Sequence, residues 1–250
     1  LIAGAAVAQE RANGRATLGA FFEYGDGDYD THNSFTNAAR VKGKGDADYA
    51  GVGVLGRFDF TGNAAGHPYL EATLRTGRVK VDFHSADLQD AWGRSARFKS
   101  KATYTGASLG AGYVWQVSEQ ARLTAYGKYL WTHENGDSVR LSTGDPVKFS
   151  AVDSHRLRLG ARYSRNIGDN KAATAYAGLA WEHEFDGKAK ARVYGYPIDA
   201  PELKGDSGLV ELGFTMNPTA HKPLTLDLGL QGYAGKREGV TGTVKVNWRF

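Results

Sequence analysis

The sequence predicts an all-β fold, a transmembrane antiparallel up-and-down β-barrel with about 11 strands in this chain. Three observations predict it. Apolar and polar side chains alternate over many long stretches, short and long connections alternate between those stretches, and no apolar run is long enough to form a membrane-spanning helix. The composition is consistent with this class, because 33 of 250 residues are glycine and 12% are aromatic.

The strands are identified from residues that alternate with period two. Leu226, Leu228 and Leu230, for example, alternate with Asp227 and Gln231. Successive side chains of a strand point to opposite faces, so each such stretch has one apolar and one polar face. Strands are predicted at 1–11, 14–27, 47–60, 67–83, 101–117, 120–134, 150–166, 172–186, 207–217, 223–235 and 238–250. Many exceed the roughly 5 or 6 residues of soluble sheets, which suits strands that cross a bilayer obliquely.

The first ten residues admit two interpretations. Ala6-Val7-Ala8 resembles the cleavage site of a signal peptide, although no charged segment precedes it. The interpretation that we favour is a strand of small residues. Removal of a signal peptide would leave ten strands, which is also an allowed even number.

The connections divide into two kinds. Those at 12–13, 61–66, 118–119, 167–171 and 218–222 are short, whereas those at 28–46, 84–100, 135–149 and 187–206 are long, and a tight turn at 236–237 ends the second series. Alternate connections of a hairpin-linked sheet lie at opposite ends. Outer-membrane barrels have short periplasmic turns and long external loops. We therefore expect extracellular long loops and a C-terminus at the periplasmic rim.

Aromatic side chains mark both ends of the apolar faces, as expected where lipid meets water. Near the short turns these are Phe58, Phe60, Tyr113, Trp115, Tyr163, Phe214, Trp248 and Phe250; near the long loops they are Phe22, Tyr24, Tyr129, Trp131 and Trp181. The alternative is that they form the core of a soluble ligand-binding barrel. The many large charges on the opposite faces favour the membrane.

The polar faces of neighbouring strands carry opposite charges. The residues predicted to face the lumen are Arg156, Arg158, Arg162, Glu182, Glu184, Glu211, Asp227 and Lys245. Neighbouring strands lie about 4.8 Å apart, so side chains at matched heights can pair. A salt-bridge ladder that stiffens the barrel is the interpretation that we favour.

The last strand ends on an aromatic residue. Val244, Val246, Trp248 and Phe250 alternate with Lys245 and other polar residues. This ending is similar to the signal that bacterial outer-membrane assembly machinery reads by pairing with a final strand.

The whole chain resembles the autotransporter β-domain, the C-terminal translocator of type V secretion. The resemblance is carried by stretches 14–30, 53–60, 126–131, 153–163 and 182–187 and by the closing stretch 229–250. It implies a twelve-stranded barrel threaded by an N-terminal helix that continues into a secreted passenger. Residues 1–250 are then one outer-membrane translocator domain that lacks one strand and the plug helix. Its partners are outer-membrane lipids, the assembly machinery, and its own passenger and plug helix.

Other motifs have simpler explanations than catalysis or ligand binding. Ser108 lies in a Gly-x-Ser-x-Gly pattern, but inside an alternating strand and not on the turn that a hydrolase nucleophile needs. Asp26, Asp28 and Asp30 lack the later glutamate of a calcium loop. His133-Glu134 and Glu182-His183-Glu184 point to alternating faces, which favours hydrogen bonding at the rim over a metal site. We expect no metal and no cofactor.

The predicted function is export of an N-terminal passenger through a bacterial outer-membrane barrel, with no enzymatic step in this chain. In some members of the family, luminal acids assist self-cleavage of the passenger. The sequence pI is near 9.1, but basic and acidic residues are mixed along the chain, so nucleic-acid binding is not expected. We expect the protein to be a monomer. A ten-stranded porin or a surface-exposed enzyme barrel is the alternative, and a soluble ligand-binding barrel is a second one.

Overall fold

The main sheet is antiparallel and follows the order of the chain. The computed structural model describes all residues except 36–37, 169–172, 199–200, 217–223 and 249–250. Within the described residues an 11-stranded sheet has the order β1-β2-β3-β4-β5-β6-β9-β10-β13-β14-β15. Its strands are β1 (Ile2–Arg11), β2 (Gly14–Phe35), β3 (Ala38–Phe60), β4 (Gly66–Gln89), β5 (Ser95–Ser118), β6 (Ala121–Glu134), β9 (Val152–Ile167), β10 (Ala173–Glu184), β13 (Gly205–Met216), β14 (Leu224–Gly235) and β15 (Gly239–Trp248). The predicted antiparallel up-and-down fold is confirmed.

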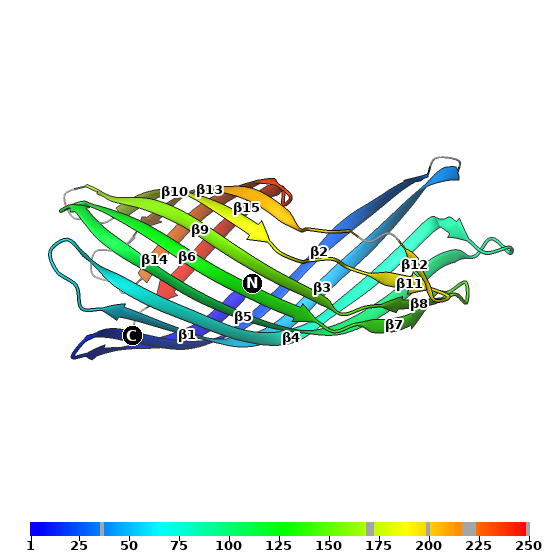
Figure 1. Ribbon diagram of the computed structural model, residues 1–250, viewed down its shortest axis with the longest axis horizontal. Helices are drawn as coiled ribbons and strands as arrows, with labels where there is room; N and C mark the ends of the chain where they lie inside the picture. The colour runs from blue at the N-terminus through cyan, green and yellow to red at the C-terminus, as the bar shows by residue number, and fades with distance from the viewer. Residues whose placement is uncertain (36–37, 169–172, 199–200, 217–223, 249–250) are drawn as a thin grey trace.

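The sheet curls into the wall of a barrel, with its strands running obliquely to the long axis (Figure 1). In the described part of the chain β1 pairs only with β2, and β15 pairs only with β14. The wall is therefore open between these two strands. No helix among the described residues is long and apolar enough to cross a membrane.

Short turns lie together at one end of the wall. Ala12 and Asn13 join β1 to β2, and the backbone N–H of Thr61 donates to the Asn13 carbonyl across the neighbouring turn. Gly14 follows Asn13 with a φ of 148°, a conformation that glycine adopts without steric cost. We call this end the short-turn rim.

The long connections are ordered strands over much of their length, which differs from the prediction. β2, β3, β4 and β5 have 22, 23, 24 and 24 residues, so most of the expected loops at 28–46 and 84–100 extend the barrel strands. These hairpins project beyond the shorter strands at the end of the wall opposite the short-turn rim (Figure 1). We call the projecting part the extension.

The expected loops at 135–149 and 187–206 contain a second sheet. It has the order β12-β11-β8-β7 and consists of β7 (Asp137–Arg140), β8 (Pro146–Phe149), β11 (Ala191–Val193) and β12 (Tyr196–Ile198). This small sheet packs on the extension through aromatic rings. The centroid of Phe98 lies 5.2 Å from that of Phe83 and 5.4 Å from that of Phe149. A small apolar core therefore forms outside the barrel.

The two faces of β4 exchange polarity at Thr76 and Gly77. Before this point the exposed face carries Leu70 and Leu74, and the opposite face carries Glu71 and Arg75. Beyond it the exposed face carries Arg78 and Lys80, and the opposite face carries Val79, Val81 and Phe83. On β5 the same exchange separates exposed Leu109 from exposed Lys101 and Lys99. The exchange marks the boundary between the apolar band of the wall and the water-exposed extension.

Candidate functional site

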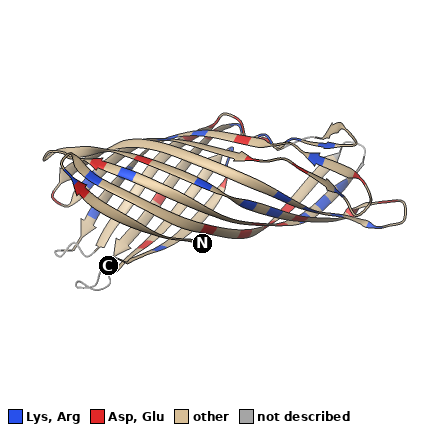
Figure 2. Cartoon of the chain, turned by 90° about the horizontal axis from the view of Figure 1, so that it is seen from below, with Lys and Arg blue, Asp and Glu red and all other residues tan. Residues whose placement is uncertain are grey.

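The concave side of the wall carries charge, and the convex side carries apolar side chains. Glu182, Glu184 and Glu211 are buried on the concave side, whereas Leu109 and Leu179 are 64% and 66% exposed on the convex side. A soluble barrel has the opposite arrangement, because its apolar side chains fill the interior. The outward apolar face therefore fits contact with lipid hydrocarbon. Lys, Arg, Asp and Glu are spaced along the strands between long uncharged stretches (Figure 2).

Glu182 is the centre of a charged cluster on the concave side. Its Cα partner across the β9–β10 ladder is Arg158, whose Nε and Nη2 donate to Glu182 Oε2 at 2.8 and 2.6 Å. Arg237 Nη1 donates to the other oxygen at 2.8 Å, and Arg156 Nη1 lies 3.7 Å from it. Three guanidinium groups thus surround a carboxylate that is 1% exposed, which compensates its desolvation. Arg237 was not predicted, because it lies in the turn between β14 and β15.

Arg162 and Glu211 pair across an intervening strand. Arg162 Nε and Nη2 donate to Glu211 Oε1 and Oε2, both at 2.7 Å. Gly178 on β10 lies between them, as the Cα partner of Arg162 on one side and of Glu211 on the other. A Cβ at Gly178 would overlap the Glu211 carboxylate. Glycine therefore leaves the space in which this bidentate pair forms.

The remaining predicted charges differ in how they are paired. Glu184 accepts from Ser154 Oγ at 2.6 Å and from the backbone N–H of His155 at 2.8 Å, and it lies 3.7 Å from Arg156 Nε. Asp227 accepts from Thr215 Oγ1 at 2.6 Å and from the Tyr176 hydroxyl at 3.3 Å. Lys245 is the Cα partner of Asp227, yet no ion pair joins the two in the described residues, and Lys245 lies exposed on the edge strand.

Two further concave clusters were not predicted. On β2 and β5, the Tyr104 hydroxyl donates to Glu23 Oε1 at 2.5 Å, and Arg75 Nη1 lies 3.3 Å from Glu23 Oε2. Lys128 Nζ lies 2.5 Å from Glu71 Oε1 on the neighbouring part of the wall. All five residues lie at the polar positions of their alternating strands. Their concave orientation could therefore have been predicted from the same alternation that identified the strands.

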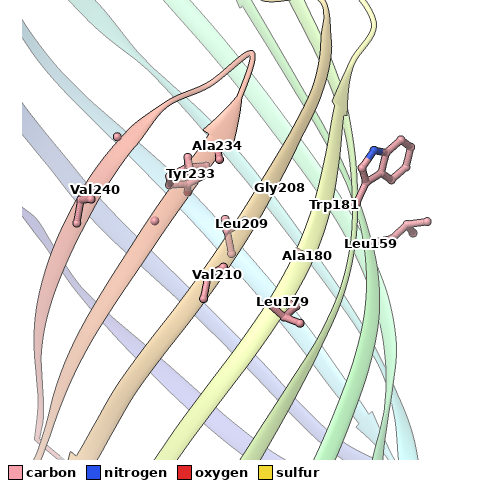
Figure 3. Close-up of a pocket in the computed structure, with 12 residues that line it drawn as sticks. Leu159, Leu179, Ala180, Trp181, Gly208, Leu209, Val210, Tyr233, Ala234 and Val240 are labelled. Atoms are coloured by element: carbon pink, nitrogen blue, oxygen red, sulfur yellow. The ribbon is translucent and has the colours of Figure 1, made fainter.

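The concave and convex hollows have opposite chemistry. A concave pocket of about 380 Å³ is lined by charged and phenolic side chains, among them Arg57, Glu71, Tyr126, Arg162 and Glu211. A convex groove of about 610 Å³ has no charged side chain in its lining (Figure 3). Its lining includes Leu179, Trp181, Val210, Gly208 and Gly232. The groove suits hydrocarbon chains, whereas the concave pocket suits a polar segment.

The predicted aromatic residues lie on the convex side of their strands. Phe58 and Phe60 contact each other near the short-turn rim, as do Tyr113 and Trp115, with ring centroids 4.8 Å apart in both pairs. Tyr163 and Phe214 lie near the same rim, and Phe22, Tyr24 and Tyr129 lie toward the other. Most of these rings are at least one-third exposed. Their positions fit the two interfaces of an apolar band.

Two Trp-x-His sequences at the far end of the band form the same hydrogen-bonded group. The indole of Trp131 donates to Asp153 Oδ1 at 3.3 Å, and His133 Nδ1 lies 2.9 Å from the same oxygen. On β10 and β13 the indole of Trp181 donates to Asp206 Oδ1 at 2.9 Å, and His183 Nδ1 lies 2.8 Å from it. Both histidines are thus engaged in hydrogen bonds at the rim. The described residues contain no group of three or more His, Cys, Asp or Glu arranged to hold a metal ion.

The last strand presents an apolar row at the free edge of the wall. Val244, Val246 and Trp248 are all exposed and share one face of β15. Phe250, the other member of the predicted assembly signal, lies outside the described residues. Ser108 lies within β5, in the extended conformation expected from its sequence.

Comparison with known families assigns the chain. A sequence model described as "Autotransporter beta-domain" matches residues 1–231. The chain belongs to the autotransporter β-domain family. With the outward apolar face of the wall, this membership identifies it as a translocator domain of the bacterial outer membrane.

Two curated relatives extend the comparison of this autotransporter β-domain. The chain is 28% identical over 248 residues to uncharacterized protein YaiT of Salmonella typhimurium, covering 81% of this chain and 24% of the relative. It is 30% identical over 158 residues to putative uncharacterized protein YaiT of Escherichia coli, covering 61% of this chain and 14% of the relative. The chain therefore spans a quarter or less of the length of these relatives.

Solved structures of other autotransporters share the fold. The transport unit of AIDA-I from Escherichia coli has a TM-score of 0.74 and 16% identity, and the alignment covers 100% of this chain and 81% of that one. The β-domain of Bordetella BrkA has a TM-score of 0.67 and 17% identity, with coverage of 98% and 86%. The translocator domain of NalP from Neisseria meningitidis has a TM-score of 0.60 and 13% identity, with coverage of 100% and 85%.

Proposed function

We propose that this autotransporter β-domain exports a passenger linked to its N-terminus, which crosses the outer membrane along the charged concave wall. The observation that carries the proposal is the opposite polarity of the two faces of one continuous sheet. An apolar convex band suits the hydrocarbon core, as in outer-membrane barrels generally, and a polar concave wall suits a hydrated polypeptide. Membership of the family supplies the link to a passenger.

The concave charges are arranged to pair with one another. The Glu182 cluster and the Arg162–Glu211 pair both satisfy their carboxylates within the wall. A polypeptide that moves along this part of the wall meets carboxylates that are already paired with arginine, so they do not hold it in place. These charges therefore act as a stiff polar lining, and no covalent step is assigned to them.

The proposed orientation places the extension and the small sheet outside the cell and the short-turn rim in the periplasm. This orientation is supported by the unequal length of the connections at the two ends of the wall, since long external loops and short periplasmic turns are typical of outer-membrane barrels. The C-terminus then lies at the periplasmic rim. There the exposed edge of β15 is available to pair with a strand of the assembly machinery, which is the role proposed for Val244, Val246 and Trp248.

The experiment uses an epitope near the N-terminus of the mature full-length protein, in the proposed passenger. A position next to Leu1 is not used, because it lies at the end of β1 opposite the short-turn rim and would be external in any inserted barrel. Export predicts that antibody reaches the epitope on intact cells and that protease added outside removes it. A control variant that lacks 239–250 should lose the surface signal, because the assembly strand is gone. An epitope that stays inaccessible on intact cells, with the barrel folded in the outer membrane, would refute export. Swelling of protein-loaded vesicles in sugar solution would then favour a porin.

A further inference from the structure

Four cations lie together on the convex face of β4 and β5, immediately beyond the polarity exchange. They are Arg78 and Lys80 on β4 and Lys99 and Lys101 on β5, and all four are exposed. Lys80 and Lys101 are Cα partners, with Arg78 and Lys99 two residues away along their own strands. We call these four residues the basic patch.

The height of the basic patch follows from the register. Arg78 is the Cα partner of Ala50, which is also the partner of Tyr24, one of the rim aromatics. Lys80 and Lys101 lie two residues farther from the short-turn rim, or about 6–7 Å along the strand. Leu74, on the same face of β4 below Arg78, still belongs to the apolar band. The basic patch thus begins where hydrocarbon ends, at the depth of lipid headgroups.

The charge of the basic patch is only partly balanced. Lys80 Nζ lies 3.9 Å from Asp48 Oδ1, and Lys99 Nζ lies 3.2 Å from Asp82 Oδ1. These contacts are exposed, so each contributes little. Within the described part of the chain no ion pair involves Arg78 or Lys101. Asp46 and Asp48 on β3 and Asp82 on β4 lie on the same face. The positive charge left without an ion pair in the described residues is therefore that of Arg78 and Lys101.

Hydroxyl groups lie between the cations and the apolar band. Thr103 and Thr105 are exposed on the same face of β5 as Lys101 and Leu109. The surface thus passes, in order, from aliphatic side chains through hydroxyls to ammonium and guanidinium groups. A lipid with a phosphorylated sugar headgroup has the matching order of acyl chains, sugar hydroxyls and phosphates.

We infer that the basic patch binds the phosphates of a phosphorylated glycolipid in the outer leaflet. The guanidinium of Arg78 and the ammonium groups of Lys80, Lys99 and Lys101 contact the phosphates. Thr103 and Thr105 face the sugar, and Leu74 and Leu109 contact the acyl chains. The assignment to the outer leaflet rests on the orientation proposed above.

The test measures binding to symmetric vesicles, so its result does not depend on the orientation of the barrel. Full-length protein is titrated with phosphatidylcholine vesicles that contain a bisphosphorylated glucosamine lipid or its dephosphorylated form. Wild type should bind the phosphorylated lipid more tightly, and high salt should remove the difference. Lys80→Gln/Lys101→Gln should weaken this binding by roughly fivefold for each cation neutralised.

A matched variant controls for net charge. Lys188→Gln/Lys190→Gln also removes two exposed cations, but from the segment that leads into the small sheet. Its affinity should equal that of wild type. Heat-modifiable migration checks folding, and Arg78→Gln alone replaces the double variant if that one does not fold. Equal binding of both lipids by wild type would overturn the inference. So would an equal loss in both variants, or no loss in the patch variants.

Discussion

Arg237 Nη1 lies 2.8 Å from Glu182 Oε1, although 55 residues separate them in the sequence. The turn that carries Arg237 is also held by its backbone N–H, which donates to Ser207 Oγ at 2.9 Å. Among the residues that the structure describes, the last hairpin, β14–β15, is paired on only one side, because β15 is an edge strand. Arg237 therefore fastens this hairpin to the interior of the wall.

Replacement of Arg237 by Gln should loosen that hairpin. Removing one partner of a buried ion pair costs about 3–5 kcal/mol. We expect less here, about 1–2 kcal/mol, because Glu182 keeps Arg158 and the Arg237 side chain is 35% exposed. The temperature at which the folded band disappears in heat-modifiable electrophoresis measures the loss. Arg165→Gln, at an exposed arginine of β9, is the control. Equal transition temperatures for Arg237→Gln and wild type would contradict the role.

Gly178→Ala should disrupt the Arg162–Glu211 pair. The new Cβ would overlap the Glu211 carboxylate, so either the ion pair or the β10 backbone must shift. Overpacking of this kind costs about 1–3 kcal/mol. Denaturant unfolding in detergent measures it. Gly232→Ala is the matched control, because no atom lies within 4 Å of a Cβ at that position. The explanation fails if both alanine variants unfold at the same denaturant concentration.

The sequence predicted the strands of the apolar band well but made four of them too short: β2 and β4 continue beyond the predicted ends at 27 and 83, and β3 and β5 begin before the predicted starts at 47 and 101. In 67–83 the apolar residues change phase, from Leu70 and Leu74 to Val79, Val81 and Phe83. The predicted strand runs through this change of phase to 83, and the stretch beyond 83 was assigned to a loop. The change of phase is the boundary of the apolar band and can be read from sequence when it is sought.

Contacts between distant strands required the structure. Glu23 and Tyr104 both have the polar phase, but they lie on β2 and β5 with two strands between them. The Tyr104 hydroxyl reaches Glu23 across Gly51 and Gly77, where a Cβ would overlap it. Arg237 lies in a turn, where alternation assigns no face. Matched height allowed opposite charges on neighbouring strands to pair without naming the partners. Arg158 pairs with Glu182, whereas Asp227 and its Cα partner Lys245 form no ion pair in the described structure.

An arginine placed on β5 should distinguish the apolar band from the extension. Leu109 and Thr103 lie on the same convex face of one strand, on opposite sides of the polarity exchange. Arginine facing lipid near the middle of a bilayer costs about 2–4 kcal/mol, against about 0–1 kcal/mol near its surface. Leu109→Arg should thus be the more destabilised variant in denaturant unfolding from vesicles. Equal stability of Leu109→Arg and Thr103→Arg would place the bilayer elsewhere on the wall.

Asp137 should make the attachment of the small sheet depend on pH. Asp137 Oδ2 accepts from the backbone N–H of Lys101 at 3.0 Å and from Ser100 Oγ at 2.8 Å. These two hydrogen bonds hold the pKa of Asp137 below its ordinary value of 3.8, and the bond from the Lys101 N–H has the larger effect. A carboxyl group with a lowered pKa stabilises the folded state above its unfolded pKa, and this contribution is lost as pH falls through the lowered value. Amide-exchange protection in 138–149, corrected for intrinsic rates, should therefore fall below about pH 4.

Two variants test this assignment. Asp137→Asn should have low protection and no fall in protection near pH 4, because its side chain does not titrate. Asp186→Asn, at an exposed carboxylate outside this contact, should behave as wild type. A step that persists in Asp137→Asn would assign the titration to another group.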